Sequence, residues 1–156
     1  MIVRNIKEFK KLTYQKKIIC FDYGKKKIGV AISDENHKIS IPMSIIFKNK
    51  EFKEKIKELI CNYNVGGILM GLPVDQNYKT NKMSQSIKDV TKNIDFYLKN
   101  NNLKIPIFFW DESFTSIEAE MKTNHLFKNT KKQKESIDKY AAQIILDDFF
   151  RFTVNE

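Results

Sequence analysis

The sequence predicts an α/β protein with a five-stranded mixed sheet, three antiparallel strands followed by two parallel ones, flanked by helices. Three short apolar runs within residues 18–47 have the two-residue period of strands and are separated by turns. From residue 52 onward, stretches with helical period alternate with short apolar runs, which implies right-handed crossovers between parallel strands. The length of 156 residues suits one domain.

Residues 1–17 precede the first predicted strand and contain many lysines. Ile2, Ile6 and Phe9 recur at roughly helical spacing, which predicts a short amphipathic helix. We interpret this segment as a basic N-terminal extension, and residues 18–156 as the single domain.

Three strands are predicted to follow one another as a meander. The run Ile18–Asp22 is apolar, rich in β-branched residues and followed by a glycine turn, as in a buried strand that ends in an acid. Lys27–Ser33 alternates large apolar and small residues, which is the strand period. The third run, Ile39–Phe47, contains Pro42, which favours an edge position because proline donates no hydrogen bond to a neighbour.

The remainder of the domain is predicted to alternate helices and strands. Apolar stripes and end signals predict helices over 52–63, from about 82 to 99, from Thr115, where Glu118 completes a capping box, and over 137–152. The apolar runs Ile68–Pro73 and Ile105–Trp110 predict strands. The stretch Lys128–Lys134 shows neither period and predicts a loop.

The charge of the chain favours a polyanionic partner. The sequence has 28 Lys+Arg against 19 Asp+Glu, a formal net charge of +9. Nucleic acid is the first candidate and an acidic membrane surface the second; a functionally neutral, lysine-rich surface is the alternative. No stretch has the apolar length of a membrane span, and we expect no membrane partner.

Two cysteines give no zinc-binding pattern. Cys20 lies in the first predicted strand and Cys61 on an apolar helix face, where free cysteines act as small hydrophobic residues. The absence of a disulfide framework suits a reducing compartment, so we expect a cytoplasmic protein.

Acidic residues stand at three junctions between buried elements and loops. Asp22 ends the first strand, Glu112 follows the fifth strand together with Asp111, and Asp138 opens the last helix. In an open α/β sheet, the functional crevice lies outside the carboxyl ends of the parallel strands. If the fourth strand lies between the first and fifth, Asp22 and Glu112 are about 10 Å apart at the backbone.

Such a group of carboxylates suggests a metal site. Three gathered carboxylates repel one another unless hard cations lie between them. Two Mg²⁺ or Mn²⁺ ions, about 3.5–4 Å apart, activate water and stabilise the leaving oxygen in phosphodiester cleavage. Taken singly, Asp138 could be favourable charge at a helix N-terminus and Asp111 a turn cap, while Asp75 is a reserve ligand.

Two groups of lysines flank the predicted acids and are candidates for binding a phosphate backbone. They are Lys25, Lys26 and Lys27 after the first strand, and Lys131, Lys132 and Lys134 before the last helix.

Four sequence blocks, in this order, carry a resemblance to a known family. They are Phe21-Asp22-Tyr23-Gly24 through Ile28-Gly29-Val30-Ala31; Gly71-Leu72-Pro73; Trp110-Asp111-Glu112 through Thr115; and Ile137-Asp138-Lys139-Tyr140-Ala141-Ala142. Over about residues 18–150, the chain resembles the YqgF/RuvX family, which has the RNase H-like fold. The resemblance implies a magnesium-dependent cytoplasmic nuclease that matures the 5′ end of 16S rRNA, with Asp22, Glu112 and Asp138 as catalytic acids.

The chain departs from the family pattern near these acids. Lys27 stands where the family usually has an arginine, and Ser113-Phe114 replace an arginine-leucine pair. Serine cannot supply the bidentate phosphate contact of an arginine, so the departures concern the binding of substrate rather than the metal acids.

Several functional alternatives stay open at this point. The family is also described as Holliday junction resolvases, which cleave branched DNA, and a non-catalytic rRNA-binding ribosome-assembly factor is a second alternative. The Asp22-x-Gly24 turn also resembles the phosphate-binding opening of sugar kinases and actin-like ATPases, but those need a second domain for which 156 residues leave no room. Both a monomer and a homodimer are compatible with the sequence.

Overall fold

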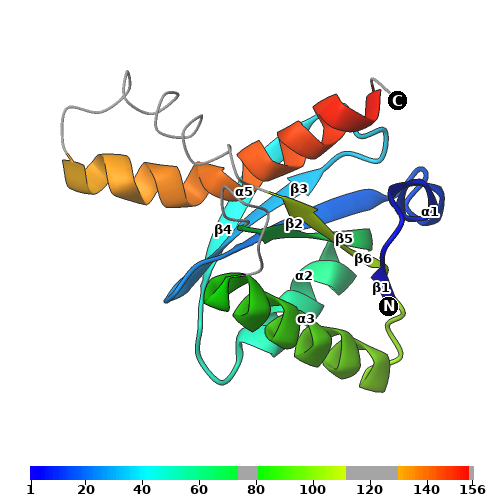
Figure 1. Ribbon diagram of the computed structural model, residues 1–156, viewed down its shortest axis with the longest axis horizontal. Coiled ribbons are helices and arrows are strands. Elements are labelled where there is room, and N and C mark those ends of the chain that lie inside the picture. Colours follow the sequence, from blue (N-terminus) through cyan, green and yellow to red (C-terminus); the bar gives the residue numbers. More distant parts are fainter. Residues whose placement is uncertain (74–80, 112–129, 155–156) are drawn as a thin grey trace.

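The computed structural model describes residues 1–73, 81–111 and 130–154, with residues 130–139 and 154 as helix backbone only. Six strands form one sheet in the order β1-β6-β5-β2-β3-β4 (Figure 1). They are β1 (Ile2–Val3), β2 (Lys17–Tyr23), β3 (Lys27–Ser33), β4 (Ser40–Phe47), β5 (Val65–Leu72) and β6 (Ile107–Asp111). β1, β6, β5 and β2 run parallel, whereas β3 is antiparallel to both β2 and β4.

The predicted mixed sheet is confirmed, with one strand more than expected. The three-stranded meander and the two later parallel strands are present, and β5 lies between β2 and β6. The sixth strand, β1, has two residues, too few to show a two-residue period in the sequence. Pro42 lies on the edge strand β4, as predicted, and pairs with Ala31 next to an irregularity in the β3–β4 register.

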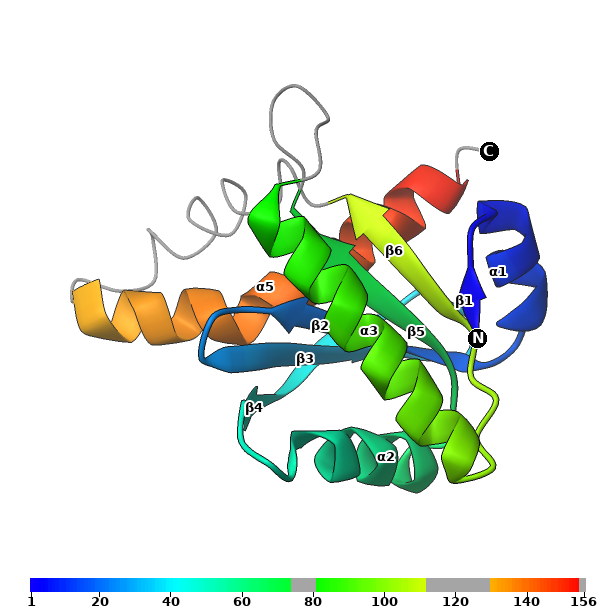
Figure 2. The ribbon, with the colours of Figure 1, turned by 60° about the horizontal axis from the view of Figure 1, so that its bottom comes forward.

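Within the described residues, four helices cover the two faces of the sheet. They are α1 (Ile6–Leu12), α2 (Phe52–Asn62), α3 (Lys82–Asn100) and α5 (Thr130–Val154). Figures 1 and 2 show α5 on one side of the sheet and α2 and α3 on the other. The alternation along β2 feeds both cores, since Ile19 and Phe21 join the cluster of α2 and α3, and Ile18 and Cys20 join that of α1 and α5.

The N-terminal segment packs on the sheet. The helix predicted within residues 1–17 is present as α1, where the side chain of Asn5 accepts hydrogen bonds from the first turn. Phe9 is fully buried, and its ring stacks on Phe108 with centroids 5.4 Å apart. The segment therefore supplies the edge strand β1 and part of the core on the α5 face.

The start of the last helix was predicted wrongly. α5 begins at Thr130, so part of the expected loop Lys128–Lys134 is helical, and Asp138 lies in the third turn instead of opening the helix. Lysine, glutamine and glutamate favour helix without producing an apolar stripe, and only the later part of α5 shows one. The capping box predicted at Thr115 lies outside the described residues.

Two smaller expectations concern the cysteines. Cys20 is buried in β2, as predicted. Cys61 is exposed on α2, so its assignment to the apolar face of this helix was wrong. The buried stripe of α2 is formed by Ile56 and Ile60, and Cys61 follows it by one residue, about 100° further around the helix.

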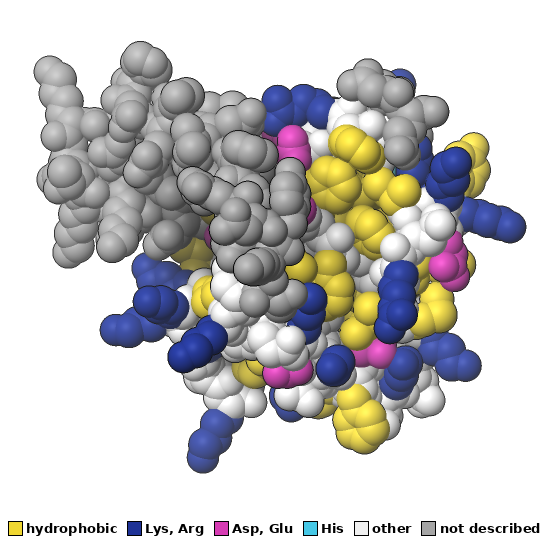
Figure 3. Space-filling model, viewed as in Figure 1, with side chains coloured by type: hydrophobic (Ala, Val, Ile, Leu, Met, Phe, Trp, Pro, Cys, Tyr) yellow, Lys and Arg dark blue, Asp and Glu magenta, His cyan; other side chains and the backbone are white. Residues whose placement is uncertain are grey.

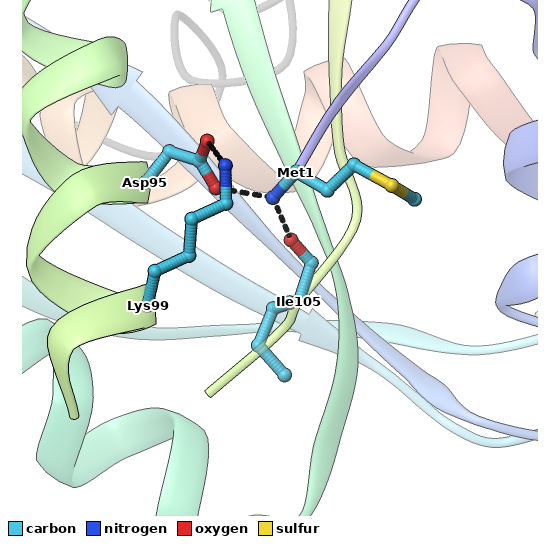
Figure 4. A network of polar contacts seen from close by, with 4 residues as sticks. All are labelled: Met1, Asp95, Lys99 and Ile105. Carbon is cyan, nitrogen blue, oxygen red and sulfur yellow. Dashed lines mark hydrogen bonds and ion pairs between the residues drawn. The ribbon is translucent and has the colours of Figure 1, made fainter. Parts of the chain in front are cut away.

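A polar network fastens the N-terminus to α3 (Figure 4). The amino group of Met1 donates to Asp95 Oδ1 and to the Ile105 carbonyl, the latter at 2.8 Å, and Lys99 Nζ lies 2.6 Å from Asp95 Oδ2. Burial raises the pKa of Asp95, but the Lys99 ammonium and the amino group lower it by more, so the net pKa lies below the usual value. The network fixes β1 beside α3.

Replacing Asp95 by asparagine is expected to destabilise the fold in a pH-dependent way. At neutral pH the Asp95→Asn variant should lose about 1–3 kcal/mol of unfolding free energy, because two cationic donors lose an ionised, largely buried acceptor. The pKa is lowered in the folded chain, so this contribution is complete above the ordinary value of 3.8 and disappears as the pH falls through the folded value. Urea unfolding of both proteins across this pH range measures it.

The matched control is Asp89→Asn, an acid on the same helix whose side chain is 57% exposed and lies 3.7 Å from Lys92. This change should alter stability by no more than about 0.5 kcal/mol. Equal losses in the two variants would contradict the assigned role of the network.

Candidate active site

Asp22 lies at the carboxyl end of the central strand β2. It is half-buried, and it follows Ile18 and Cys20 at the two-residue period, so its position belongs to the α5 face of the sheet. The parallel strands β5, β6 and β1 end at the same edge. Asp22 therefore stands where open α/β sheets place their functional crevice.

A pocket of about 460 Å³ opens beside Asp22. Asp22 pairs with Gly29 across β2 and β3, and Gly29 pairs with Ile45 across β3 and β4. The middle position of this row carries no side chain, so it leaves space next to the carboxylate. The pocket is lined by Asp22, Gly24, Lys25, Lys26, Lys27, Gly29 and Ile45.

The turn between β2 and β3 brings three predicted lysines to Asp22. The Gly24 N–H donates to the Lys27 carbonyl at 2.9 Å, and a Cβ on Gly24 would lie 2.9 Å from that oxygen, so only glycine suits this tight turn. Lys25, Lys26 and Lys27 consequently share one pocket with the carboxylate. The pocket therefore contains a carboxylate that can bind a metal cation and ammonium groups that can bind a phosphate.

Lys48 is a further cation at this turn, and it was absent from the predicted set. Its backbone N–H donates to the Lys26 carbonyl at 3.1 Å, its Nζ lies 3.2 Å from the Gly24 carbonyl, and Nζ stands 4.0 Å from the centre of the Tyr23 ring. The pairing of β3 with β4 could have predicted the position of Lys48, because a residue just after β4 lies beside the start of β3. Lys48 therefore supports the turn that carries the other lysines.

The second predicted acid lies beyond the end of β6. Phe108 and Trp110 belong to the cluster on the α5 face, so alternation places Asp111 on the opposite face from Asp22. Glu112 lies outside the described residues. The expected strand order is confirmed, and β5 separates the strands that carry Asp22 and precede Glu112.

Hydrogen bonds to β6 and to β4 hold α5, the helix that carries Asp138, across the sheet. Trp110 Nε1 donates to Asp148 Oδ2 at 2.9 Å, Gln143 Nε2 donates to the Ser40 carbonyl at 2.8 Å, and Ser40 Oγ donates to Asp147. The backbone of Asp138 stands four residues, about one turn, before the buried Ala142. Figure 1 shows the first half of α5, in orange, extending past the sheet on the side where β2 and β3 are joined.

The remaining predicted lysines lie on this first half of α5. Lys131, Lys132 and Lys134 belong to its first two turns, where the structure describes the backbone alone.

The donor chemistry suits a hard divalent cation. Carboxylate oxygens are the ligands that Mg²⁺ and Mn²⁺ prefer, and Asp22 supplies a carboxylate to the pocket that Gly29 also lines. Among the described side chains, no three His, Cys, Asp or Glu residues form a metal-binding group. The other two predicted ligands, Glu112 and Asp138, have no described side chain.

Comparison with known families decides the relationship of the chain. The family model described as "RuvX: Holliday junction resolvase" matches residues 16–151. The chain belongs to the RuvX family. The resemblance noted in the sequence is thereby confirmed, and the matched range begins just before β2 and ends within α5.

Sequence relatives of this RuvX chain carry a consistent name. A protein of Pelagibacter ubique is 33% identical over 153 residues, covering 96% of this chain and 98% of its own. One of Orientia tsutsugamushi is 35% identical over 153 residues, covering 94% and 92%. Both are named "Putative pre-16S rRNA nuclease".

A solved structure supports the fold of this RuvX chain. Thermus thermophilus RuvC, solved in complex with a Holliday junction substrate, superposes with a TM-score of 0.52 at 10% identity, covering 90% of this chain and 96% of that one. The likeness supports the predicted RNase H-like architecture.

Filling the space above Gly29 is expected to impair cation binding without unfolding the sheet. In the described chain no glycine has a positive φ, so the backbone at Gly29 accepts a side chain, and valine favours strands. The Gly29→Val variant should stay folded but lose about 1–3 kcal/mol of unfolding free energy, because Gly29 is buried. It should bind Mn²⁺ about tenfold more weakly or worse, the scale of disturbing a group beside a metal ligand. Mn²⁺ titration followed by electron paramagnetic resonance measures the affinity.

Ser44→Val is the matched control, because it introduces the same side chain on the opposite face of the sheet. Ser44 pairs with Val30, whose side chain belongs to the core under α2 and α3. Its Mn²⁺ affinity should equal that of the wild type. If the Gly29→Val protein folds and binds Mn²⁺ with unchanged affinity, the pocket beside Asp22 is not the cation-binding site.

Proposed function

We propose that this protein is a metal-dependent nuclease that cleaves structured RNA in the cytoplasm and acts in maturation of the 5′ end of 16S rRNA. The nuclease class, hydrolysis of an ester bond, follows from membership of the RuvX family. The metal, the substrate and the residue roles are the content of the proposal.

One observation carries the proposal: a half-buried carboxylate and three lysines share a pocket at the carboxyl edge of the sheet. Lys25, Lys26 and Lys27 bind and orient the phosphate backbone, while the Asp22 carboxylate faces the same space. A phosphodiester and a divalent cation are the two ligands whose charges this pocket complements.

Asp22, Glu112 and Asp138 would hold the cations. Bound Mg²⁺ or Mn²⁺ supplies activation of a water nucleophile and neutralisation of charge on the leaving oxygen. The chain's own contribution is position, since β2 fixes Asp22 and the bonds of Trp110 and Gln143 hold α5 against the sheet.

Two further facts support RNA as the substrate. The relatives from Pelagibacter and Orientia are named for pre-16S rRNA and align over nearly their whole length. The formal net charge of +9 suits a polyanion.

In the described residues no helix is long and apolar enough to cross a membrane.

Cleavage of a 16S precursor fragment, beside a four-way DNA junction, tests the proposal. The wild type should cut the RNA with Mg²⁺ or Mn²⁺ and lose this activity with chelator. The Asp22→Asn and Glu112→Gln variants should be slower by about a thousandfold or more, the scale of losing a group that acts in the transition state. Single-turnover rates on gels measure this loss.

Glu35→Gln is the control, because Glu35 is an exposed acid in the turn between β3 and β4. It should cleave like the wild type. Cutting of the junction alone would move the function to DNA recombination, and salt-dependent binding of both substrates without cutting would indicate a non-catalytic assembly factor; either result overturns the proposal.

A further inference from the structure

A second cationic groove, of about 560 Å³, lies between the edge strand β1 and helix α3. We name it the α3 groove; it is lined by Ile2, Val3, Arg4, Gln85, Lys88, Lys92, Phe108 and Phe109. None of its cations belongs to the Asp22 pocket or to the lysine groups recognised in the sequence.

The α3 groove exists because β1 is short and tied to α3. The bond from the Met1 amino group to Asp95 places the chain beside the helix, and Lys92 and Lys88 stand one and two turns before Asp95. β1 ends at Val3, opposite Phe108, whereas β6 continues to Asp111. The end of β6 therefore extends past its neighbour and leaves a hollow at the edge of the sheet.

The charges in the groove suit an anionic ligand. Arg4 and Lys92 are exposed, Lys88 is half-buried, and the lining residues include no carboxylate. Asp89 approaches Lys92 to 3.7 Å from outside the lining, and that exposed contact is screened by water. Figure 3 shows lysine and arginine side chains around hydrophobic ones on the face that carries α3 and β1.

An aromatic side chain borders the groove. Phe109 is half-buried and lies on the face of the sheet that carries α3, whereas the ring of Phe108 faces α1 and stacks on Phe9. A ring between cations is the combination with which proteins bind nucleic-acid strands, because the ring contacts a base or sugar while the cations contact phosphates.

We propose that the α3 groove binds the phosphate backbone of the structured RNA at a distance from the cleaved bond. The inference rests on the proposed function for its ligand. The Asp22 pocket belongs to the α5 face of the sheet and α3 covers the opposite face. The carboxyl ends of β1 and β2 lie at the same edge, so an RNA in the Asp22 pocket can cross this edge to reach Arg4.

Neutralising the groove tests the proposal. The triple variant Arg4→Gln, Lys88→Gln, Lys92→Gln is compared with Lys38→Gln, Lys55→Gln, Lys104→Gln, three exposed lysines that line neither the groove nor the Asp22 pocket. Fluorescence anisotropy with a 16S precursor fragment, in chelator and over a range of salt concentrations, gives the Kd. The groove variant should bind about tenfold more weakly or worse. The slope of log Kd plotted against log salt concentration should fall by about 2 to 3, because three cationic contacts are lost.

The cleavage rate at saturating protein separates the groove from the proposed function. It should stay at the wild-type value in the groove variant, because the Asp22 pocket is intact. Weaker binding by the groove variant supports the groove even if the wild type cuts nothing. Equal Kd values for the two triple variants, or a wild type that binds no RNA, overturn it.

Folding of both variants is checked by circular dichroism. If the triple groove variant does not fold, the single changes Arg4→Gln and Lys92→Gln, both at exposed positions, decide the question. Each should weaken RNA binding in the same direction, and wild-type affinity in both singles would overturn the proposal.

Discussion

Burial of β2 on both of its faces determines where the other elements lie. Its side chains alternate between two cores, Ile19 and Phe21 toward α2 and α3, Ile18 and Cys20 toward α1 and α5. Each core must be closed by a helix layer, because a sheet with two apolar faces cannot face water on either. The same alternation carries Asp22 to the α5 face, so one strand pattern sets both the cores and the position of the candidate catalytic acid.

The elements that pack on both sides could be predicted from the sequence, and those with little apolar surface could not. β3 has the predicted bounds Lys27–Ser33, since its alternation is complete. β1 was missed because pairing of Ile2 and Val3 with β6 is a tertiary event that leaves no local pattern. The first two turns of α5 were missed because Lys131–Lys134 lack the apolar stripe by which a packed helix is recognised.

The candidate site shows the same division between local and non-local information. Asp22 and the lysines at 25–27 adjoin one another in the chain, so a single turn signal predicted their association. Lys48 and Arg4 reach the functional edge through strand pairing, Lys48 beside Lys26 and Arg4 beyond Val3. Their sequence surroundings resemble those of any surface cation. Only the register of the sheet distinguishes them.

The layout of the charges bears on the kind of substrate that the protein can hold. β5 and β6 lie between β2 and β1, so the strand that carries Asp22 and the strand that precedes Arg4 are roughly 14 Å apart, given strand spacings of about 4.8 Å. A dinucleotide in the Asp22 pocket cannot also fill the groove. A folded RNA presents phosphates over that distance without paying for the ordering of a flexible strand, because its backbone is already fixed by base pairing. Two separated groups of cationic side chains therefore suit a structured RNA better than a single strand, in line with the proposed action on a ribosomal precursor.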